Sequence, residues 1–247
     1  MTAQLRSELY KLRSTWTAAS VVAAMLALVT LAVLLHALSL PASRLTSGPD
    51  QRGVFTDVGM NLGALFAGLL GALSITGEIR TGTIRPTLLV TPRRGLVIAA
   101  KAVTILAAGF AAGVISAGAA AGAGGAALAS RGITIQLGAT DYTQLILGGG
   151  AAAAMWALIG LGAGAVIRAQ VPAIVALFAW LLFVENIIGG DLPSVIRFFP
   201  GALARALAGQ QRSGTLHAPA VAALLLALYA ALALAAGRTA TTRRDVG

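Results

Sequence analysis

Six long stretches of the sequence contain no Asp, Glu, Lys or Arg, and these stretches constrain the fold more than any other feature. They cover 14–43, 58–77, 102–130, 142–167, 169–184 and 213–237. A helix needs about 20 apolar residues to cross a hydrocarbon core of roughly 30 Å. Five of the stretches reach that length. The remaining one, 169–184, reaches it by continuing through Glu185 to Ile188.

We therefore predict an all-α integral membrane protein in which one transmembrane domain, 1–247, contains six transmembrane helices. Lipid offers no hydrogen-bond partners, so a span must satisfy its backbone polar groups internally, as a helix does. Continuous apolar runs also exclude a transmembrane β-barrel, whose strands alternate over about ten residues. The first span is too long for the apolar region of a signal peptide, so we predict that it is retained. The predicted spans are 17–40, 58–77, 102–130, 143–167, 171–189 and 217–237.

The composition agrees with a membrane protein and excludes an ordinary soluble enzyme. Of the 247 residues, 57% are hydrophobic and 11% are charged, whereas soluble domains carry about 25% charged residues. Lys and Arg exceed Asp and Glu by 18 to 8. In a membrane protein this excess indicates orientation rather than a nucleic-acid partner, since cytoplasmic loops are enriched in basic residues. With a cytoplasmic N-terminus, twelve basic residues lie inside and six outside. We predict a multi-pass protein of the cytoplasmic (inner) membrane with both termini in the cytoplasm.

A short amphipathic helix is predicted before the first span, over 3–15. Leu5, Leu9, Leu12 and Trp16 recur at the spacing of one helical face, and charged residues occupy the other faces. Such a helix suits the membrane interface, where basic residues meet anionic lipid and tryptophan lies at the headgroup level. The alternative is a solvated basic tail.

The segment 78–101, between the second and third spans, is the most informative polar stretch. Residues 81–83, Thr-Gly-Thr, break the second helix. Pro86 suits the first turn of a new helix, because its fixed φ is helical and its missing N–H is not needed there. Pro92 ends that helix, since a helix usually stops before the residue preceding a proline. The predicted helix, 86–91, carries leucines that must be buried against lipid headgroups or a partner protein.

A second polar segment, 191–209, lies between the fifth and sixth spans on the outer face. Pro193 and Pro200 divide it into two short helical pieces, and Arg197 and Arg205 make it too polar to span. Non-helical backbone is tolerated at membrane depth only where protein or water covers it. We therefore predict a re-entrant or lid-like outer segment.

Glycines recur every fourth residue in two of the predicted spans, at Gly109 and Gly113 and at Gly160 and Gly164. Small residues at this spacing let helix backbones approach closely. We expect packing within the bundle, with a contact between subunits as the alternative. The stretch 102–130 would be about 43 Å long as a helix, so it must tilt, kink or project from the membrane.

Motifs for catalysis and cofactor binding are missing from the sequence. There are no cysteines and only two histidines, which excludes cysteine sites and histidine-rich metal sites. A P-loop needs a lysine directly after a glycine, and the only lysines, Lys11 and Lys101, follow Tyr10 and Ala100. We predict no catalytic residue, no metal and no cofactor in this chain, and no enzyme activity of its own.

The order of residues around 78–101 resembles the permease subunits of bacterial ABC-2 type ABC transporters. The shared pattern is a Glu ending the second span, then Gly-Thr, leucines, Pro-Arg, and a Lys opening the third span. The residues that match it are Glu78, Gly82, Thr83, Leu88, Leu89, Pro92, Arg93 and Lys101. The N-terminal helix is also similar, as are Arg168, Gln170, Trp180, Glu185, Pro193, Pro200 and Gly201. The resemblance covers nearly the whole chain.

The resemblance implies that the helix 86–91 is a coupling helix, which docks into a cleft of a separate ABC ATP-binding subunit. That subunit would bind ATP and Mg²⁺, and two permease copies, as a homodimer, would join two ATPases. The chain would then export a hydrophobic or amphipathic substrate, such as a drug, an antibiotic or a lipid-like molecule. The implied ATPase-coupling residues are Glu78, Gly82, Thr83, Arg85, Pro86, Leu88, Leu89, Pro92 and Arg93.

The resemblance also implies that the outer segment caps the exit path. The implied outer gate or clamp residues are Glu185, Asn186, Arg197, Phe198, Phe199 and Pro200. An ionisable residue within a span is a functional candidate, and we expect Glu185 to pair with Arg197 or Arg205, a cargo or proton site being the alternative.

The segment 78–101 begins and ends with a charged residue, and we expect a definite position for each. Glu78 should pair with basic residues of the coupling loop or lie as a charge at the headgroup level. Lys101 should extend to the cytoplasmic surface, because long cationic side chains reach from a helix end toward water.

Two other functions stay open at this point. An ion- or proton-coupled secondary transporter places ionisable groups near the midplane and often shows inverted repeats, and neither is evident in this sequence. A non-transporting membrane scaffold or an intramembrane enzyme would not account for the proline-bounded basic segment. Membrane lipid is an expected partner under every alternative.

Overall fold

The computed structural model describes residues 2–83, 94–210 and 216–243, and all regular structure in these ranges is helical. Six helical stretches of this part are long and apolar enough to cross a membrane, which confirms the predicted all-helical, multi-pass membrane protein. The helices are α1 (Thr2–Ser14), α2 (Trp16–Ser39), η1 (Ala42–Arg44), α3 (Gly48–Asp57), α4 (Gly59–Arg80), α6 (Arg94–Ser130), α7 (Ala139–Ile167), α8 (Gln170–Phe178), η2 (Ala179–Val184), α9 (Glu185–Asp191), α10 (Pro193–Ile196), α11 (Pro200–Leu207) and α12 (Pro219–Arg243).

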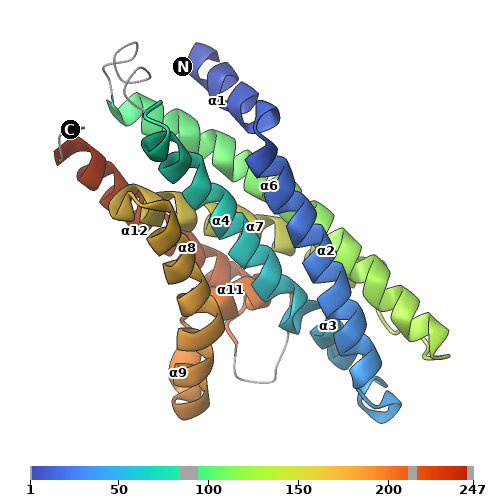
Figure 1. Cartoon of the computed structure of the whole chain (residues 1–247). Helices are drawn as coiled ribbons and strands as arrows, with labels where there is room; N and C mark the ends of the chain where they lie inside the picture. Colours follow the sequence, from blue (N-terminus) through green and yellow to red (C-terminus); the bar gives the residue numbers. More distant parts are fainter. Residues whose placement is uncertain (1, 84–93, 211–215, 244–247) are drawn as a thin grey trace.

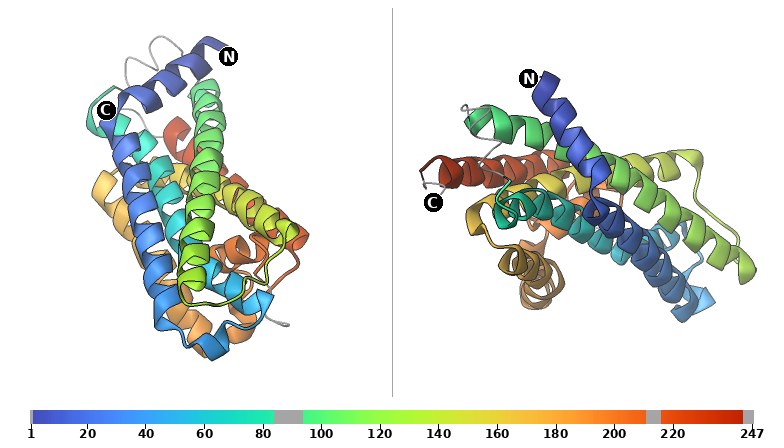
Figure 2. Two further views of the ribbon diagram at one scale, coloured as in Figure 1. Left: turned by 90° about the vertical axis from the view of Figure 1, so that its right-hand side faces the viewer. Right: turned by 45° about the horizontal axis from the view of Figure 1, so that its top comes forward.

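The helices form a bundle whose two ends differ (Figure 1). The N-terminal helix α1 and the C-terminal end of α12 lie at one end, which we call the α1 end. Helices α3 and α9 lie at the opposite end, which we call the α9 end. Two further views show α2 running beside α6 along much of its length (Figure 2). An even number of spans places the two termini at the same end, as in the prediction.

Helices α4 and α7 form the centre of the bundle. In the most apolar part of the span that contains α4, 72% of the residues are buried, and in that of α7 the share is 67%. The corresponding share is 17% for α2 and 22% for α12. The outward faces of these peripheral helices carry exposed leucines, among them Leu35 and Leu224, as expected for surfaces that face lipid.

Glycines hold α7 against its neighbours at backbone distance. Gly160 of α7 lies against the backbone of Gly68 of α4, so that no space is left for a Cβ. A Cβ built on Gly109 of α6 would lie only 2.7 Å from the Cβ of Ala157 in α7. Similar contacts are made by Gly113 and Gly164. The predicted packing of these glycines within the bundle is confirmed.

The polar segment between the second and third spans is shorter than the predicted 78–101. Helix α4 continues to Arg80, and α6 already begins at Arg94 rather than at 102. The predicted bounds were wrong because a charged residue ends an apolar run but need not end a helix. A helix can continue through charged residues once it has left the lipid. The proposed coupling helix 86–91 lies outside the described residues, as do Arg85, Pro86, Leu88, Leu89, Pro92 and Arg93.

The second and fifth spans also differ from their predicted form. Helix α3 lies directly before α4, so the helical stretch covers 48–80 rather than 58–77. The fifth span contains a π-helical turn, η2, between α8 and α9. Helices α10 and α11 follow, and each begins at a proline, Pro193 and Pro200. Helix α11 is buried and contacts α4, α7 and α12.

Candidate functional site

Four charged side chains meet at the α1 end, where three helices converge. Glu8 and Lys11 come from α1, Glu78 from the end of α4, and Lys101 from α6; we call these four residues the charge cluster. Lys101 Nζ lies 2.5 Å from Glu8 Oε2 and 3.0 Å from Glu78 Oε1. Lys11 Nζ lies 2.7 Å from Glu8 Oε1 and 2.8 Å from Glu78 Oε1. Each lysine therefore bridges both glutamates, and the cluster ties α1 to α4 and α6.

The charge cluster is largely shielded from water. The side chains of Glu8 and Lys101 are 3% and 6% exposed. Lys101 Nζ also donates to the backbone oxygen of Ser74 at 3.3 Å, so all three of its protons are used. A compact ammonium with three donors suits a position between two carboxylates. Two negative and two positive charges cancel, which is the condition under which burial of charge is tolerated.

The structure corrects the expectation for Lys101. This lysine does not extend to the surface but is buried between Glu8 and Glu78. Glu78 hydrogen-bonds Lys101 and Lys11, and the contribution of the N-terminal helix was missed. A signal was present in the sequence, because the chain uses arginine for all its other basic residues and both lysines belong to this cluster.

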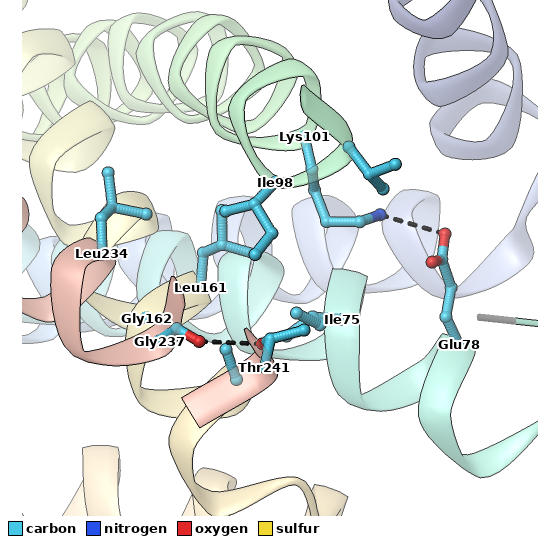
Figure 3. A pocket seen from close by; sticks show the side chains of 11 residues that line it. Ile75, Glu78, Ile98, Lys101, Leu161, Gly162, Leu234, Gly237 and Thr241 are labelled. Carbon is cyan, nitrogen blue, oxygen red and sulfur yellow. Dashed lines mark hydrogen bonds and ion pairs between the residues drawn. The ribbon is translucent and has the colours of Figure 1, made fainter. Parts of the chain in front are cut away.

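Two cavities flank the pair Glu78–Lys101. Figure 3 shows the smaller one, of about 20 Å³, where the pair borders the apolar side chains Ile75, Leu161 and Leu234. The larger one, of about 360 Å³, lies among α1, α2, α4, α6 and the start of α8, and we call it the α1 cavity. It is lined by Glu8, Lys11, Leu12, Thr15, Thr17, Leu73, Ser74, Gly77, Glu78, Arg80, Thr81, Thr83, Lys101, Thr104, Ile105 and Gln170.

Burial and the neighbouring charges shift the pKa values of Glu8 and Lys11 in opposite directions. Burial raises the pKa of Glu8, but the ammonium groups of Lys101 and Lys11 outweigh it and hold this pKa below its ordinary value of 4.5. Burial likewise lowers the pKa of Lys11, and the hydrogen bonds to Glu78 and Glu8 bring it above its ordinary 10.5. The folded state therefore favours the charged form of both groups.

We expect the attachment of α1 to be constant between pH 4.5 and 10.5, the ordinary pKa values of the two groups. The contribution of Glu8 is complete above its ordinary pKa and is lost as the pH falls through its lowered pKa. The contribution of Lys11 is complete below its ordinary pKa and is lost as the pH rises through its raised pKa. Spin labels on Ser7→Cys in α1 and Val103→Cys in α6, in this cysteine-free chain, measure the separation. A distance distribution that stays unchanged in strong acid would contradict this expectation.

The end of α4 holds the other described residues of the implied coupling set. Gly82 has φ +72, a backbone conformation that a glycine adopts without strain. Thr81 Oγ1 donates to the backbone oxygen of Gly77 at 2.9 Å, and Thr83 Oγ1 lies 3.0 Å from Thr81 Oγ1. These residues end α4 immediately after Glu78, so the start of the stretch 81–93 is fixed to the charge cluster.

Glu185 lies at the start of α9 and is 4% exposed. Its Oε1 accepts hydrogen bonds from Trp180 Nε1 and from the backbone N–H of Gly201, both at 2.9 Å. Gly201 is in the first turn of α11, whose unpaired N–H groups and positive dipole end favour a carboxylate. Glu185 thus links η2 to the first turn of α11, and Arg205 of α11 acts on it electrostatically as well.

The structure brings together only some of the implied gate residues. The guanidinium of Arg197 lies 5.0 Å from the ring centre of Phe198. The ring of Phe199 lies 5.9 Å from that of Trp180, which also binds Glu185. The side chain of Asn186 is exposed and donates to the backbone oxygen of Leu182 at 2.7 Å. Pro200 accepts a hydrogen bond from Trp156 Nε1 at 3.3 Å.

A polar network toward the α9 end was missed in the sequence. Arg52 forms an ion pair with Asp141 and donates to the backbone oxygen of Gly209 at 2.6 Å. Gln210 donates to Asp57. The sequence does not predict this network, because nothing in the spacing of these residues shows that α3, α7 and the end of α11 meet.

The charge cluster and the α1 cavity form the candidate functional site, because charged, polar and apolar side chains meet there. Within the described ranges, no group of three or more His, Asp and Glu side chains could hold a metal ion. No family model matches the chain, and no curated protein matches its sequence. The cavity can bind a small ligand. The ion pairs connect α1, α4 and α6 mechanically, because each lysine contacts carboxylates from two helices.

Proposed function

We propose that this chain is the permease subunit of an ATP-driven exporter of the ABC-2 type. It would move a hydrophobic or amphipathic substrate across the cytoplasmic membrane, powered by a separate ATP-binding subunit. The observation that supports this most directly is the charge cluster. It joins α1 to α4 and α6, the two helices that border the stretch 81–93, where the resemblance implies a coupling helix.

The connection of three helices gives a physical route for coupling. A subunit that binds the leucines of 86–91 and moves them would act on the ends of both α4 and α6. Because the charge cluster holds these ends to α1, the three helices would respond together rather than separately. In the proposed complex two permeases and two ATPases assemble, and the substrate crosses between the permeases.

The proposal also assigns a side of the membrane to each end of the bundle. The α1 end would face the cytoplasm, since the basic residues of α1 and of the described C-terminal end of α12 lie there. The α9 end would face outward and would carry the gate. Glu185 holds the first turn of α11 to the fifth span, so a movement of that span would be passed to α11.

Replacing Leu88 and Leu89 together with Asp tests the proposal. Two carboxylates in place of two docking leucines should release an ATP-binding protein that otherwise co-purifies with the full chain. We expect the ATPase activity retained on the affinity-tagged chain to fall at least tenfold, because burying an unpaired charge costs several kcal/mol. Immunoblotting of membrane fractions measures whether the chain is still inserted.

The matched control is Leu88→Ile with Leu89→Ile, which keeps the apolar surface and should keep the ATPase. Equal ATPase activity in the Asp and Ile variants would refute the docking role. A chain that is active alone, and whose activity is abolished by dissipating the proton gradient, would instead support a secondary transporter.

A further inference from the structure

We propose that the α1 cavity binds the headgroup of an anionic phospholipid from the leaflet at the α1 end. The position, the free hydrogen-bond donors and the mixed lining of the cavity each point to this ligand. The proposal requires that the helices span a membrane, and it does not require an ATP-binding partner.

The cavity lies where the apolar spans end. Thr15 and Thr17 flank the first residue of the span Trp16–Ser39, and Arg80 is the last residue of the span that contains α4. Gln170 is the first residue of the fifth span. The neighbouring Trp16 is 88% exposed, as is typical of tryptophan at the membrane–water boundary. This is the depth of phospholipid phosphate groups.

Several hydrogen-bond donors that line the α1 cavity have no acceptor within the described part of the chain. Arg80 makes no hydrogen bond or ion pair with any part of the chain that the structure describes, and the side chains of Thr15, Thr17 and Gln170 make none either. Lys11 uses two of its three ammonium protons on the charge cluster. Three basic and two acidic side chains line the cavity, which leaves a formal charge of +1. A phosphate diester supplies the acceptors and the negative charge that are missing.

The apolar part of the lining favours a lipid over a soluble phosphate. Leu12, Leu73 and Ile105 line the same cavity as Arg80, so a ligand must be polar at one side and apolar at the other. The volume of about 360 Å³ is within the usual range for a small-molecule site. Basic pockets between transmembrane helices are known to hold anionic headgroups.

The charge requirement is tested with Arg80→Gln and with Arg13→Gln as its matched control. Arg13 is an exposed residue of α1 outside the cavity, so the control removes the same charge at the same end. The full chain, purified in detergent and stripped of lipid, is titrated with phosphatidylglycerol or phosphatidylcholine and followed by native mass spectrometry. We expect phosphatidylglycerol to bind at least tenfold more tightly, and Arg80→Gln to weaken it about tenfold, since one charge-assisted hydrogen bond is lost.

Gly77 provides a test that leaves every charge in place. It lines the cavity, and a Cβ built on it meets no atom within 4 Å. Gly77→Leu should therefore fill the cavity and prevent lipid retention without disturbing the helix, where Leu is favoured over Gly. Gly77→Ala, which adds one methyl group, should retain the lipid. An unchanged melting temperature shows that both variants are folded.

Three results would overturn the proposal. Equal affinity for the two lipids would exclude recognition of the headgroup charge, and equal behaviour of Arg80→Gln and Arg13→Gln would exclude the cavity. Competition by glycerol 3-phosphate as strong as by phosphatidylglycerol would show that the site takes a soluble phosphate. The lipid proposal and the proposed transport function can fail separately. A chain that retains lipid but has no ATP-binding partner would refute only the transport function, and a chain that retains the partner but binds no lipid would refute only the lipid site.

Discussion

Replacing Lys101 with Met is expected to detach α1 and to lower the stability of the folded chain by about 3–5 kcal/mol. Glu8 and Glu78 would then share only Lys11, and two carboxylates would lie close together in a site shielded from water. Removing one partner of a buried ion pair leaves an uncompensated charge, which costs far more than the pair contributes. The spin-label distance between α1 and α6 and the thermal unfolding midpoint in detergent measure the two effects.

A second substitution distinguishes charge from packing at Lys101. Adding Glu8→Gln to Lys101→Met removes one charge of each sign and restores neutrality, so most of the lost stability should return. A double-mutant cycle then gives the coupling between the two residues. If the double variant is as unstable as the sum of the single variants, the loss comes from packing around the lysine stem. In that case the charge cluster would not be what attaches α1.

Replacing Gly160 with Leu is expected to prevent the normal packing of the bundle. The new side chain would have to occupy the position of the Gly68 backbone in α4. Overpacking usually costs about 1–3 kcal/mol, and here the cost should exceed that range because backbone atoms, unlike side chains, cannot rotate away. We expect little folded protein by size-exclusion chromatography in detergent.

Gly122 in α6 is the matched control for this substitution. No atom lies within 4 Å of a Cβ built on it, although it is also a glycine of a long transmembrane helix. Gly122→Leu should therefore leave the amount of folded protein unchanged or increase it, since glycine is a poor helix former. Equal loss in the two variants would mean that glycine flexibility, rather than the close approach of α4 and α7, is what the bundle needs.

Much of the fold could be predicted from hydropathy, and the reason is physical. A span must be long and apolar to cross lipid, so the six charge-free runs correspond to six helical stretches of the described chain. Helix ends outside the lipid have no such requirement. Hydropathy therefore could not show that α6 starts at Arg94, or that α3 extends the second span to Gly48.

The candidate site was less predictable because it depends on which helices are neighbours. Glu78 and Lys101 could be recognised by their positions at the ends of two spans. That Glu8 completes their charges follows from α1 lying across the ends of α4 and α6, and no periodicity in the first residues indicates this. Lys101 was expected in water because an isolated lysine prefers it, but two buried carboxylates change that preference.

The length of α6 has a mechanical consequence. Its 37 residues extend about 55 Å, nearly twice the thickness of a hydrocarbon core of about 30 Å. Near its middle, Gly109 and Gly113 press it against α7. Just beyond its far end, Arg131 donates to the backbone oxygens of Ala37 and Leu40 at 2.5 and 2.7 Å. If α6 moves as one rigid body about its contact with α7, its two ends move in opposite directions. We expect a sideways push on the end near Lys101 to shift the end near Arg131 the other way, and with it the end of α2 that Arg131 holds.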